Sequence, residues 1–184
     1  MLKNDIILSK KEMILLQFFT ENPTQKFYVG EIIRKLGISS SNISAALRRL
    51  KDKNFLKSEK SANALYYFLN NQNFIVRELK KILFLAKKEI KEIINKLLEK
   101  SVKVIIYGSF ASGDYTEKSD IDIMVVGINI KKEEIYQILK KYEEILNRKI
   151  HPIILSLSEY EKLGGKDPAF FIEIQKGMVF DNGL

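Results

Sequence analysis

The 184-residue chain is predicted to fold as a mixed α/β (α+β) protein in three segments, 1–70, 71–100 and 101–184. In the first segment, three stretches with apolar residues at helical spacing are followed by two short strand-like runs. The last segment contains apolar runs at 102–107 and 120–126 that are typical of buried strands, and we expect a mixed sheet with flanking helices there, as in the family that this segment resembles below. The middle segment has helical periodicity throughout and is expected to form one long connecting helix.

The amino-acid composition excludes several classes of protein and of metal site. Hydrophobic residues at 46% and charged residues at 29% are typical of globular proteins with a core. Cysteine is absent and His151 is the only histidine, which excludes disulfides, thiolate metal sites and multi-histidine sites. Any metal must therefore be held by oxygen. No apolar run approaches the roughly 18 residues of a membrane span, so we expect no membrane partner and a cytoplasmic location.

The charge is unevenly distributed. The net charge is +8, with +10 in the first hundred residues and −2 in the rest. A basic first half favours a polyanionic partner, and a slightly acidic second half favours a site that holds its own cations. A solvated lysine surface is the alternative explanation.

The first segment carries local signals for three helices and a hairpin. A helix begins after Ser9 and stops at Asn22; a second, over 29–36, ends at Gly37; a third begins in the polar run 39–42. The two strand-like runs are Phe55–Glu59 and Leu65–Leu69. This order is that of a winged helix-turn-helix.

The stretch from Gly37 to Leu50 resembles the recognition region of MarR- and ArsR-like regulators. The resemblance implies double-stranded DNA as a partner, with the third helix in the major groove. The residues expected to contact DNA are Ser41, Asn42, Ser44, Arg48 and Arg49 on that helix and Lys57 and Lys60 on the wing. The alternative is a winged helix used only for protein packing.

The expected connecting helix has a repeating apolar seam. Its members are spaced three and four residues apart: Val76, Leu79, Leu83, Ala86, Ile90, Ile93 and Leu97. Such a heptad pattern favours a homodimer contact. Packing of the helix on its own chain is the alternative, because further apolar residues widen the stripe.

The third segment contains a candidate chemical site. Asp120 and Asp122 are two residues apart at an apolar strand, so both carboxylates should lie on one side of it. Two such carboxylates favour a hard cation, and Mg²⁺ with phosphate oxygens in its shell suits them. Gly108 and Ser109 follow the preceding strand, where exposed N–H groups and a hydroxyl can hold triphosphate oxygens.

The run from Gly108 to Asp122 resembles the signature of the DNA polymerase beta-like nucleotidyltransferases, and most of all the minimal nucleotidyltransferases. The resemblance implies nucleotidyl transfer from ATP or another NTP to a hydroxyl, with Mg²⁺ on Asp120 and Asp122. It also implies nucleotide binding by Gly108, Ser109 and Ser119. Small members of this branch often pair with HEPN proteins in toxin–antitoxin modules, which implies a protein acceptor of that type.

This sequence departs from the family pattern at one position, because the family carries a third carboxylate on the next strand. His151 stands near that position and is expected to take part in catalysis, as a base or a nitrogen ligand. An ordinary strand position for His151 is the alternative, with Glu159 or Asp167 substituting from nearby. Two functions therefore stay open: a nucleotidyltransferase coupled to a DNA-binding winged helix, or a DNA-binding regulator or antitoxin with a weakly active or inactive nucleotide-binding domain.

Overall fold

The computed structural model describes residues 7–38 and 42–182. The chain divides into two compact units, Met1–Lys80 and Lys81–Leu184. Within the described ranges, no helix has the length and apolar character needed to cross a membrane.

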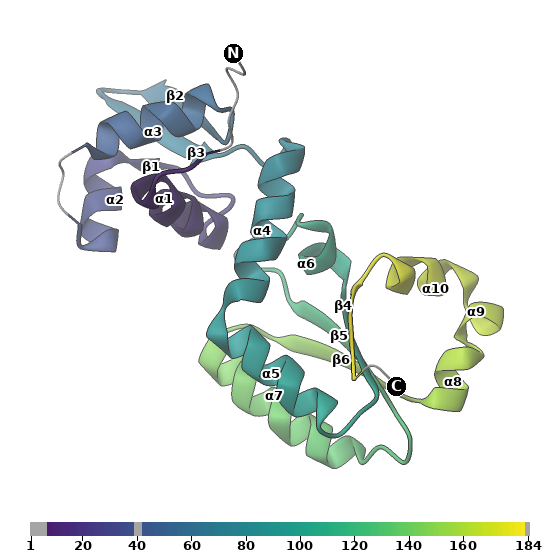
Figure 1. Cartoon of the computed structure of the whole chain (residues 1–184). Helices are drawn as coiled ribbons and strands as arrows, with labels where there is room; N and C mark the ends of the chain where they lie inside the picture. The colour runs from purple at the N-terminus through teal and green to yellow at the C-terminus, as the bar shows by residue number, and fades with distance from the viewer. Residues whose placement is uncertain (1–6, 39–41, 183–184) are drawn as a thin grey trace. The chain divides into compact units, whose positions relative to one another are not determined.

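The first unit contains three helices, a three-stranded antiparallel sheet and the start of a fourth helix (Figure 1). In chain order the elements are α1 (Lys10–Glu21), β1 (Phe27–Tyr28), α2 (Val29–Leu36), α3 (Ile43–Asp52), β2 (Leu56–Ser61), β3 (Ala64–Leu69) and α4 (Phe74–Ala86). The sheet order is β1-β3-β2. This is the predicted winged-helix order, with β1 added; two residues are too few to show a strand alternation in sequence.

The helix boundaries of this unit follow the predicted local signals. The Ser9 hydroxyl accepts from the Glu12 amide, and the Glu12 carboxylate accepts from the Ser9 amide, so the pair forms a capping box. Gly37 ends α2 with φ of 61°, and Asn54 follows α3 with the same φ. Both residue types tolerate this left-handed conformation.

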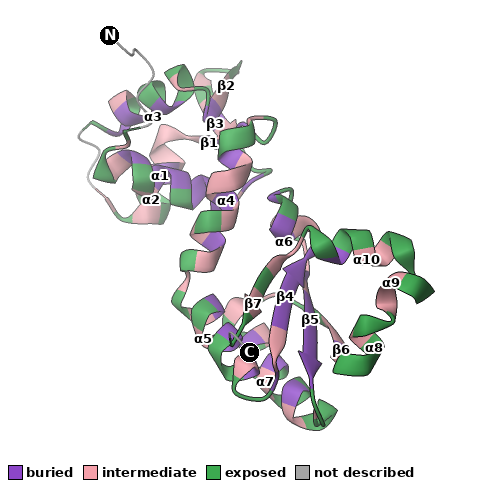
Figure 2. Ribbon diagram, turned by 45° about the vertical axis from the view of Figure 1, so that its right-hand side comes forward, coloured by how far each residue is buried: buried purple, intermediate pink, exposed green. Residues whose placement is uncertain are grey.

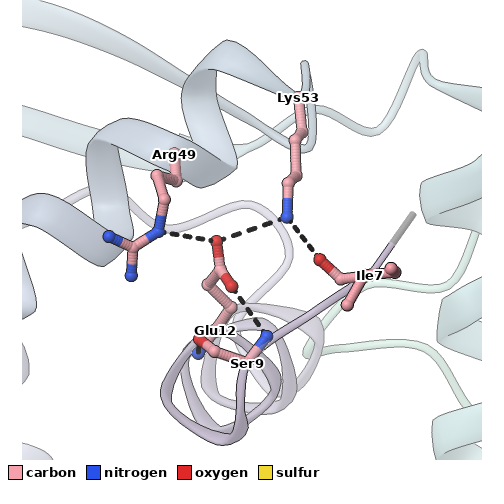
Figure 3. Close-up of polar contacts among 5 residues, drawn as sticks. All are labelled: Ile7, Ser9, Glu12, Arg49 and Lys53. Atoms are coloured by element: carbon pink, nitrogen blue, oxygen red, sulfur yellow. Dashed lines mark hydrogen bonds and ion pairs between the residues drawn. The ribbon is translucent and has the colours of Figure 1, made fainter. Parts of the chain in front are cut away.

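Glu12 also ties α1 to α3 (Figure 3). Its Oε1 lies 3.2 Å from Arg49 Nε and 3.4 Å from Lys53 Nζ, while its side chain is only 3% exposed. Burial alone would raise the pKa of Glu12, but the hydrogen bonds from Ser9 and Arg49 and the charge of Lys53 lower it to about 2. The carboxylate is therefore held ionised inside the unit.

The second unit is built on a four-stranded mixed sheet of order β6-β5-β4-β7. Its elements after α4 are α5 (Lys88–Leu98), β4 (Lys103–Tyr107), α6 (Gly108–Ser112), β5 (Ile121–Gly127), α7 (Lys132–Leu146), β6 (Ile150–Ser156), α8 (Leu157–Glu161), α9 (Leu163–Lys166), α10 (Pro168–Gln175) and β7 (Met178–Asp181). Strand β5 pairs in parallel with β6, and β4 pairs antiparallel with β5 and β7. The α7 crossover makes the parallel pairing possible.

Helices cover both faces of this sheet (Figure 1). Alternate residues of β5 belong to the cores on opposite faces of the sheet. Ile121, Ile123 and Val125 pack with α5 and α7. Met124 and Val126 pack in a second cluster that includes Ile174 of α10. Figure 2 shows β4 and β5 as predominantly buried central strands. Side chains of β4 and β5 therefore point alternately toward α5 and α7 or toward α8–α10.

The prediction of a single connecting helix over residues 71–100 is wrong. The segment forms two helices, because Lys87 between them has an extended backbone with ψ of 134°. Of the predicted seam, Val76 is buried in the core of the first unit. Ile90, Ile93 and Leu97 are buried in the core of the second. Most of the apolar periodicity thus reflects packing on the chain itself, which was the alternative explanation, whereas Leu83 and Ala86 belong to neither core.

Candidate active site

Three strands meet at one edge of the sheet of the second unit. Strand β4 ends at Tyr107, which lies opposite Asp122 on β5. Asp122 in turn lies opposite His151 on β6. The antiparallel and parallel pairings therefore bring one strand end and two strand starts together, although the residues are far apart in sequence.

The predicted catalytic side chains come together at this edge. Asp120 immediately precedes β5, and Asp122 is its second residue. His151 Nε2 lies 3.5 Å from Asp120 Oδ2, and His151 Nδ1 lies 3.8 Å from Asp122 Oδ1. The three side chains are 39%, 31% and 60% exposed in the order Asp120, Asp122, His151, so a ligand can reach all of them.

Gly108 lies against the carboxylate of Asp122. It begins α6 with φ of 65°, a conformation that favours glycine. The next residue, Ser109, is half-buried. Among the described residues, no hydrogen bond is made by the Ser109 hydroxyl, so it is free to bind a ligand.

Burial and like charges shape the electrostatics of the site. The pKa of Asp122 is raised by burial first, and further by Asp120 and Glu173, while His151 opposes the shift. Burial, with the charges of Asp122 and Glu173, raises the pKa of Tyr107 to about 12. The carboxylates therefore repel each other at neutral pH, and a cation placed between them would relieve this repulsion.

The loop that leads to Asp120 is held by an arginine that sequence reasoning missed. Arg148 Nη1 donates to the carbonyl oxygens of Thr116, Glu117 and Ser119, at 3.1, 3.0 and 2.8 Å. Its guanidinium also lies over the Phe110 ring, 5.3 Å from the centroid. A single charged side chain thus fixes the loop backbone just before the paired carboxylates.

Ser119, predicted to bind nucleotide, has its hydroxyl turned into this loop. Its Oγ accepts from the Thr116 amide at 2.8 Å and lies 3.3 Å from the Thr116 hydroxyl. In this structure Ser119 therefore shapes the loop.

Glu159 and Asp167, considered as substitutes for a third carboxylate, are helix caps. Glu159 Oε2 accepts from the amide and hydroxyl of Ser156 at the start of α8. Asp167 Oδ1 accepts from the Phe170 amide at the start of α10. The further acid that acts on the site is Glu173 of α10, whose charge contributes to the raised pKa of Asp122. No sequence motif marks Glu173, because it reaches the site only through the packing of α10 on the sheet.

A hollow of about 280 Å³ lies between α6 and α10. Its lining residues are Gly108, Ser109, Ala111, Ser112, Glu173 and Lys176. It therefore combines the predicted phosphate-binding residues with two charged side chains, Glu173 of α10 and Lys176 directly after that helix.

The residues present fit a divalent cation that keeps several non-protein ligands. Among the described residues, no group of three or more acidic or histidine side chains has an arrangement that could hold a metal ion by itself. Asp120 and Asp122 supply carboxylate oxygens, which Mg²⁺ prefers, and phosphate and water oxygens commonly complete its octahedral shell. This matches a metal bound together with a nucleotide.

The predicted DNA-binding residues lie mostly on exposed positions of the first unit. Ser44, Arg48 and Arg49 are exposed on α3, opposite its buried Ile43 and Leu47. Asn42 is exposed just before α3, and Lys60 is exposed on β2. Lys57 on β2 is half-buried and donates to Gln72. Arg49 differs from Ser44 and Arg48 because its side chain already pairs with the buried Glu12 carboxylate. Ser41 lies outside the described residues.

Comparisons with known proteins agree with both units. Residues 87–178 match the nucleotidyltransferase domain family, and residues 8–64 match the MarR family. The first match spans half of the chain, which therefore belongs to the nucleotidyltransferase domain family, joined to a MarR-like winged helix.

Two relatives come from Methanocaldococcus jannaschii, and each is named "Putative protein adenylyltransferase". They are 37% and 36% identical; the matches cover 35% and 36% of this chain and 81% and 73% of the relatives. A crystal structure titled as a "putative nucleotidyltransferase" from Sulfolobus solfataricus aligns with 58% of this chain and 84% of its own, at 23% identity and a TM-score of 0.35.

Proposed function

We propose that the second unit transfers a nucleotidyl group from ATP or another nucleoside triphosphate to a hydroxyl group, with Mg²⁺ bound to Asp120 and Asp122. The observation that carries the proposal is the placement of these two carboxylates beside Gly108 and Ser109 at one sheet edge. Bound Mg²⁺ would offset charge on the phosphoryl oxygens. The relatives named as protein adenylyltransferases support a protein side chain as acceptor.

In the proposed reaction, the acceptor hydroxyl oxygen forms a bond to the α-phosphorus. The bond between that phosphorus and the oxygen bridging to the β-phosphate breaks, and pyrophosphate leaves. The chain's own part is to position the triphosphate with Gly108 and Ser109 and to remove the hydroxyl proton.

His151 is the proposed proton acceptor. It is the most exposed of the three catalytic candidates and lies within 4 Å of both carboxylates, so an incoming hydroxyl can reach it at the metal site. A neutral imidazole accepts a proton, whereas a protonated one does not. His151→Gln should therefore lower the rate more than it lowers nucleotide affinity.

The first unit is proposed to bind double-stranded DNA through α3 and the wing. The exposed Ser44 and Arg48 on one face of α3, together with Lys60 on β2, support this proposal. DNA would then localise or regulate the transfer reaction. A homodimer and a HEPN-type protein acceptor are further parts of this proposal; they rest on the family resemblance and on the symmetry of many DNA sites.

The test is incubation of the full chain with labelled nucleoside triphosphate, Mg²⁺ and candidate protein acceptors, followed by detection of covalent label. Asp120→Asn with Asp122→Asn should abolish labelling. Glu144→Gln with Glu161→Gln is the matched control, because it removes the same charge from exposed helix positions of the same unit. Equal labelling by the Asp120/Asp122 variant would refute the assignment.

A second candidate function is a DNA-binding regulator that binds nucleotide without turnover. The histidine in place of a third carboxylate favours it, because imidazole brings no negative charge and suits Mg²⁺ poorly. Nucleotide binding without any transfer, together with a nucleotide-dependent change in DNA affinity, would select this function.

A further inference from the structure

Helix α10 is fixed on the sheet by residues along one of its sides. The Phe170 ring packs edge-on against Tyr107 with centroids 5.6 Å apart, and Ile174 is buried with Ile105 of β4. Just beyond the helix, a Cβ at Gly177 would lie 2.6 Å from Ile105 Cγ2. The absence of a side chain there lets the chain approach β4 closely, so the C-terminal end of α10 has a defined position.

This docking places two charged residues at the hollow beside α6. Glu173 and Lys176 are three positions apart, which puts them on neighbouring surface positions one turn apart. Both line the hollow, together with Ser109 and Ser112. Gly108 also lines the hollow, and a Cβ on it would lie 2.5 Å from Asp122 Oδ2, so the hollow lies beside the paired carboxylates.

The hollow offers donors that the protein itself does not use. Among the described residues, the Lys176 ammonium has no hydrogen bond or ion pair, and neither has the Ser109 hydroxyl. Lys176 is exposed and presents three N–H donors and a positive charge, which favour an anionic oxygen as its ligand in the hollow. The volume of about 280 Å³ is at the lower limit of small-molecule sites, so it suits part of a nucleotide.

We propose that Lys176 binds the terminal phosphates of the nucleoside triphosphate in the hollow between α6 and α10. The inference rests on the proposed function for the identity of the nucleotide, and it adds the cation that follows α10 to the residues that hold the nucleotide. Lys176 then recognises the part of the substrate that leaves as pyrophosphate. A nucleoside monophosphate lacks these phosphates and should not depend on Lys176.

The test compares inorganic triphosphate, ATP and AMP, each with Mg²⁺, by titration calorimetry on the full chain. Lys176→Gln should weaken binding of triphosphate and of ATP by roughly tenfold or more, in line with loss of a hydrogen bond to a charged group. AMP binding should not change. Lys176→Arg should restore most of the affinity. Lys166→Gln is the matched control, since Lys166 is exposed on the neighbouring α9 and does not line the hollow.

Equal triphosphate affinity in Lys176→Gln and the unchanged protein would overturn the inference, as would an equal loss for AMP. The outcome is separable from that of the proposed reaction. If labelling succeeds but Lys176→Gln keeps the same KM for the triphosphate, Lys176 is excluded and nucleotidyl transfer stands. If no label is transferred but triphosphate binding still depends on Lys176, the binding assignment stands and the transfer reaction fails.

Discussion

Gly108 and Asp122 occupy adjoining positions that leave no room for a side chain on the glycine. A Cβ at Gly108 would lie 2.5 Å from Asp122 Oδ2, which is closer than real Cβ contacts allow. The φ of 65° adds a second restriction, because side-chain-bearing residues rarely adopt it. The Asp122 carboxylate can keep this position only because residue 108 has no side chain.

The first prediction follows from this contact. Gly108→Ala should displace the Asp122 carboxylate and reduce Mg²⁺-dependent nucleotide binding by at least an order of magnitude. It should also destabilise the unit by about 1 kcal/mol or more, since alanine is strained at positive φ. Gly165→Ala is the matched control, because a Cβ there meets nothing within 4 Å. Unchanged nucleotide affinity in Gly108→Ala would contradict the assignment.

The second prediction concerns the charge of Asp122. Its pKa is raised by burial and by the neighbouring carboxylates, so its ionised form is disfavoured in the folded state. Because the pKa of Asp122 is higher in the folded state than in the unfolded state, the ionised carboxylate lowers the stability of the fold at pH values above the unfolded-state pKa. This loss of stability disappears as the pH falls and the carboxylate becomes protonated. Asp122→Asn should therefore leave thermal stability without metal unchanged or higher at pH 7, while Mg²⁺-dependent nucleotide binding is lost. The two effects are measured by thermal unfolding and titration calorimetry, with and without Mg²⁺. A clear fall in the metal-free unfolding temperature would show that Asp122 has a structural role.

The third prediction concerns Glu12, whose pKa is lowered from 4.5 to about 2. A lowered acid pKa contributes stability above pH 4.5 that is lost as pH falls toward 2. From 1.36 kcal/mol per pKa unit, the contribution at pH 7 is roughly 3 kcal/mol. Glu12→Gln should be less stable by an amount of this order in chemical denaturation at pH 7, and the difference should shrink between pH 4.5 and 2.

Glu59→Gln is the control for this prediction. Glu59 pairs with Lys26 at 2.6 Å, but the two side chains are 43% and 47% exposed. Exposed pairs contribute about 1 kcal/mol or less. Equal effects of the two substitutions would show that burial of Glu12 does not matter.

The fourth prediction concerns Arg148 and the loop before Asp120. Arg148→Ala removes three hydrogen bonds to loop carbonyls and should lower both stability, by about 1–3 kcal/mol, and affinity for nucleotide with Mg²⁺. Lys149→Ala, which changes an exposed neighbour, should alter neither. If Arg148→Ala lost stability but kept full nucleotide affinity, the loop would not position Asp120.

The fifth prediction separates Arg48 from Arg49 on α3. Arg48→Ala should weaken DNA binding and reduce the salt slope by about one unit, with stability unchanged. Arg49→Ala should in addition destabilise the protein, because it removes a partner of the buried Glu12. Fluorescence anisotropy at several salt concentrations measures the first effect, and thermal unfolding measures the second. Lys140→Ala in α7 is the control; an equal loss of DNA affinity there would argue against α3 as the contact surface.

The parts of the fold that sequence predicted depend on local signals. Ser9 and Gly37 mark helix ends by their own chemistry, and alternation along a strand placed Asp120 and Asp122 together. The break at Lys87 could not be predicted in the same way. No glycine or proline marks it, and Phe84 before the break packs in the same core as Ile90 after it, a long-range arrangement that has no local signal.

The parts of the candidate site that were missed depend on long-range packing. Glu173 and Lys176 reach the hollow because Phe170 and Ile174 dock α10 on the sheet, and no motif links them to the paired carboxylates. Arg148 likewise acts on a loop that precedes it by about thirty residues. Glu159, in contrast, has a sequence explanation as a cap: a serine three residues before a glutamate is a capping-box signal, and the structure contains that box.

Asp122 lies opposite His151 in the register of β5 and β6, so the number of residues between α7 and β6 must be kept for the site to form. Because side chains alternate along β6, deleting Lys149 would slide the following residues by one position if β6 stayed in place. His151 would then face α5 and α7, and Pro152 would take its place beside Asp122. Variants of unequal length in residues 147–149 should therefore be tolerated far less well than substitutions at the same positions. Relatives that preserve this site should vary in the residues of that turn but not in their number.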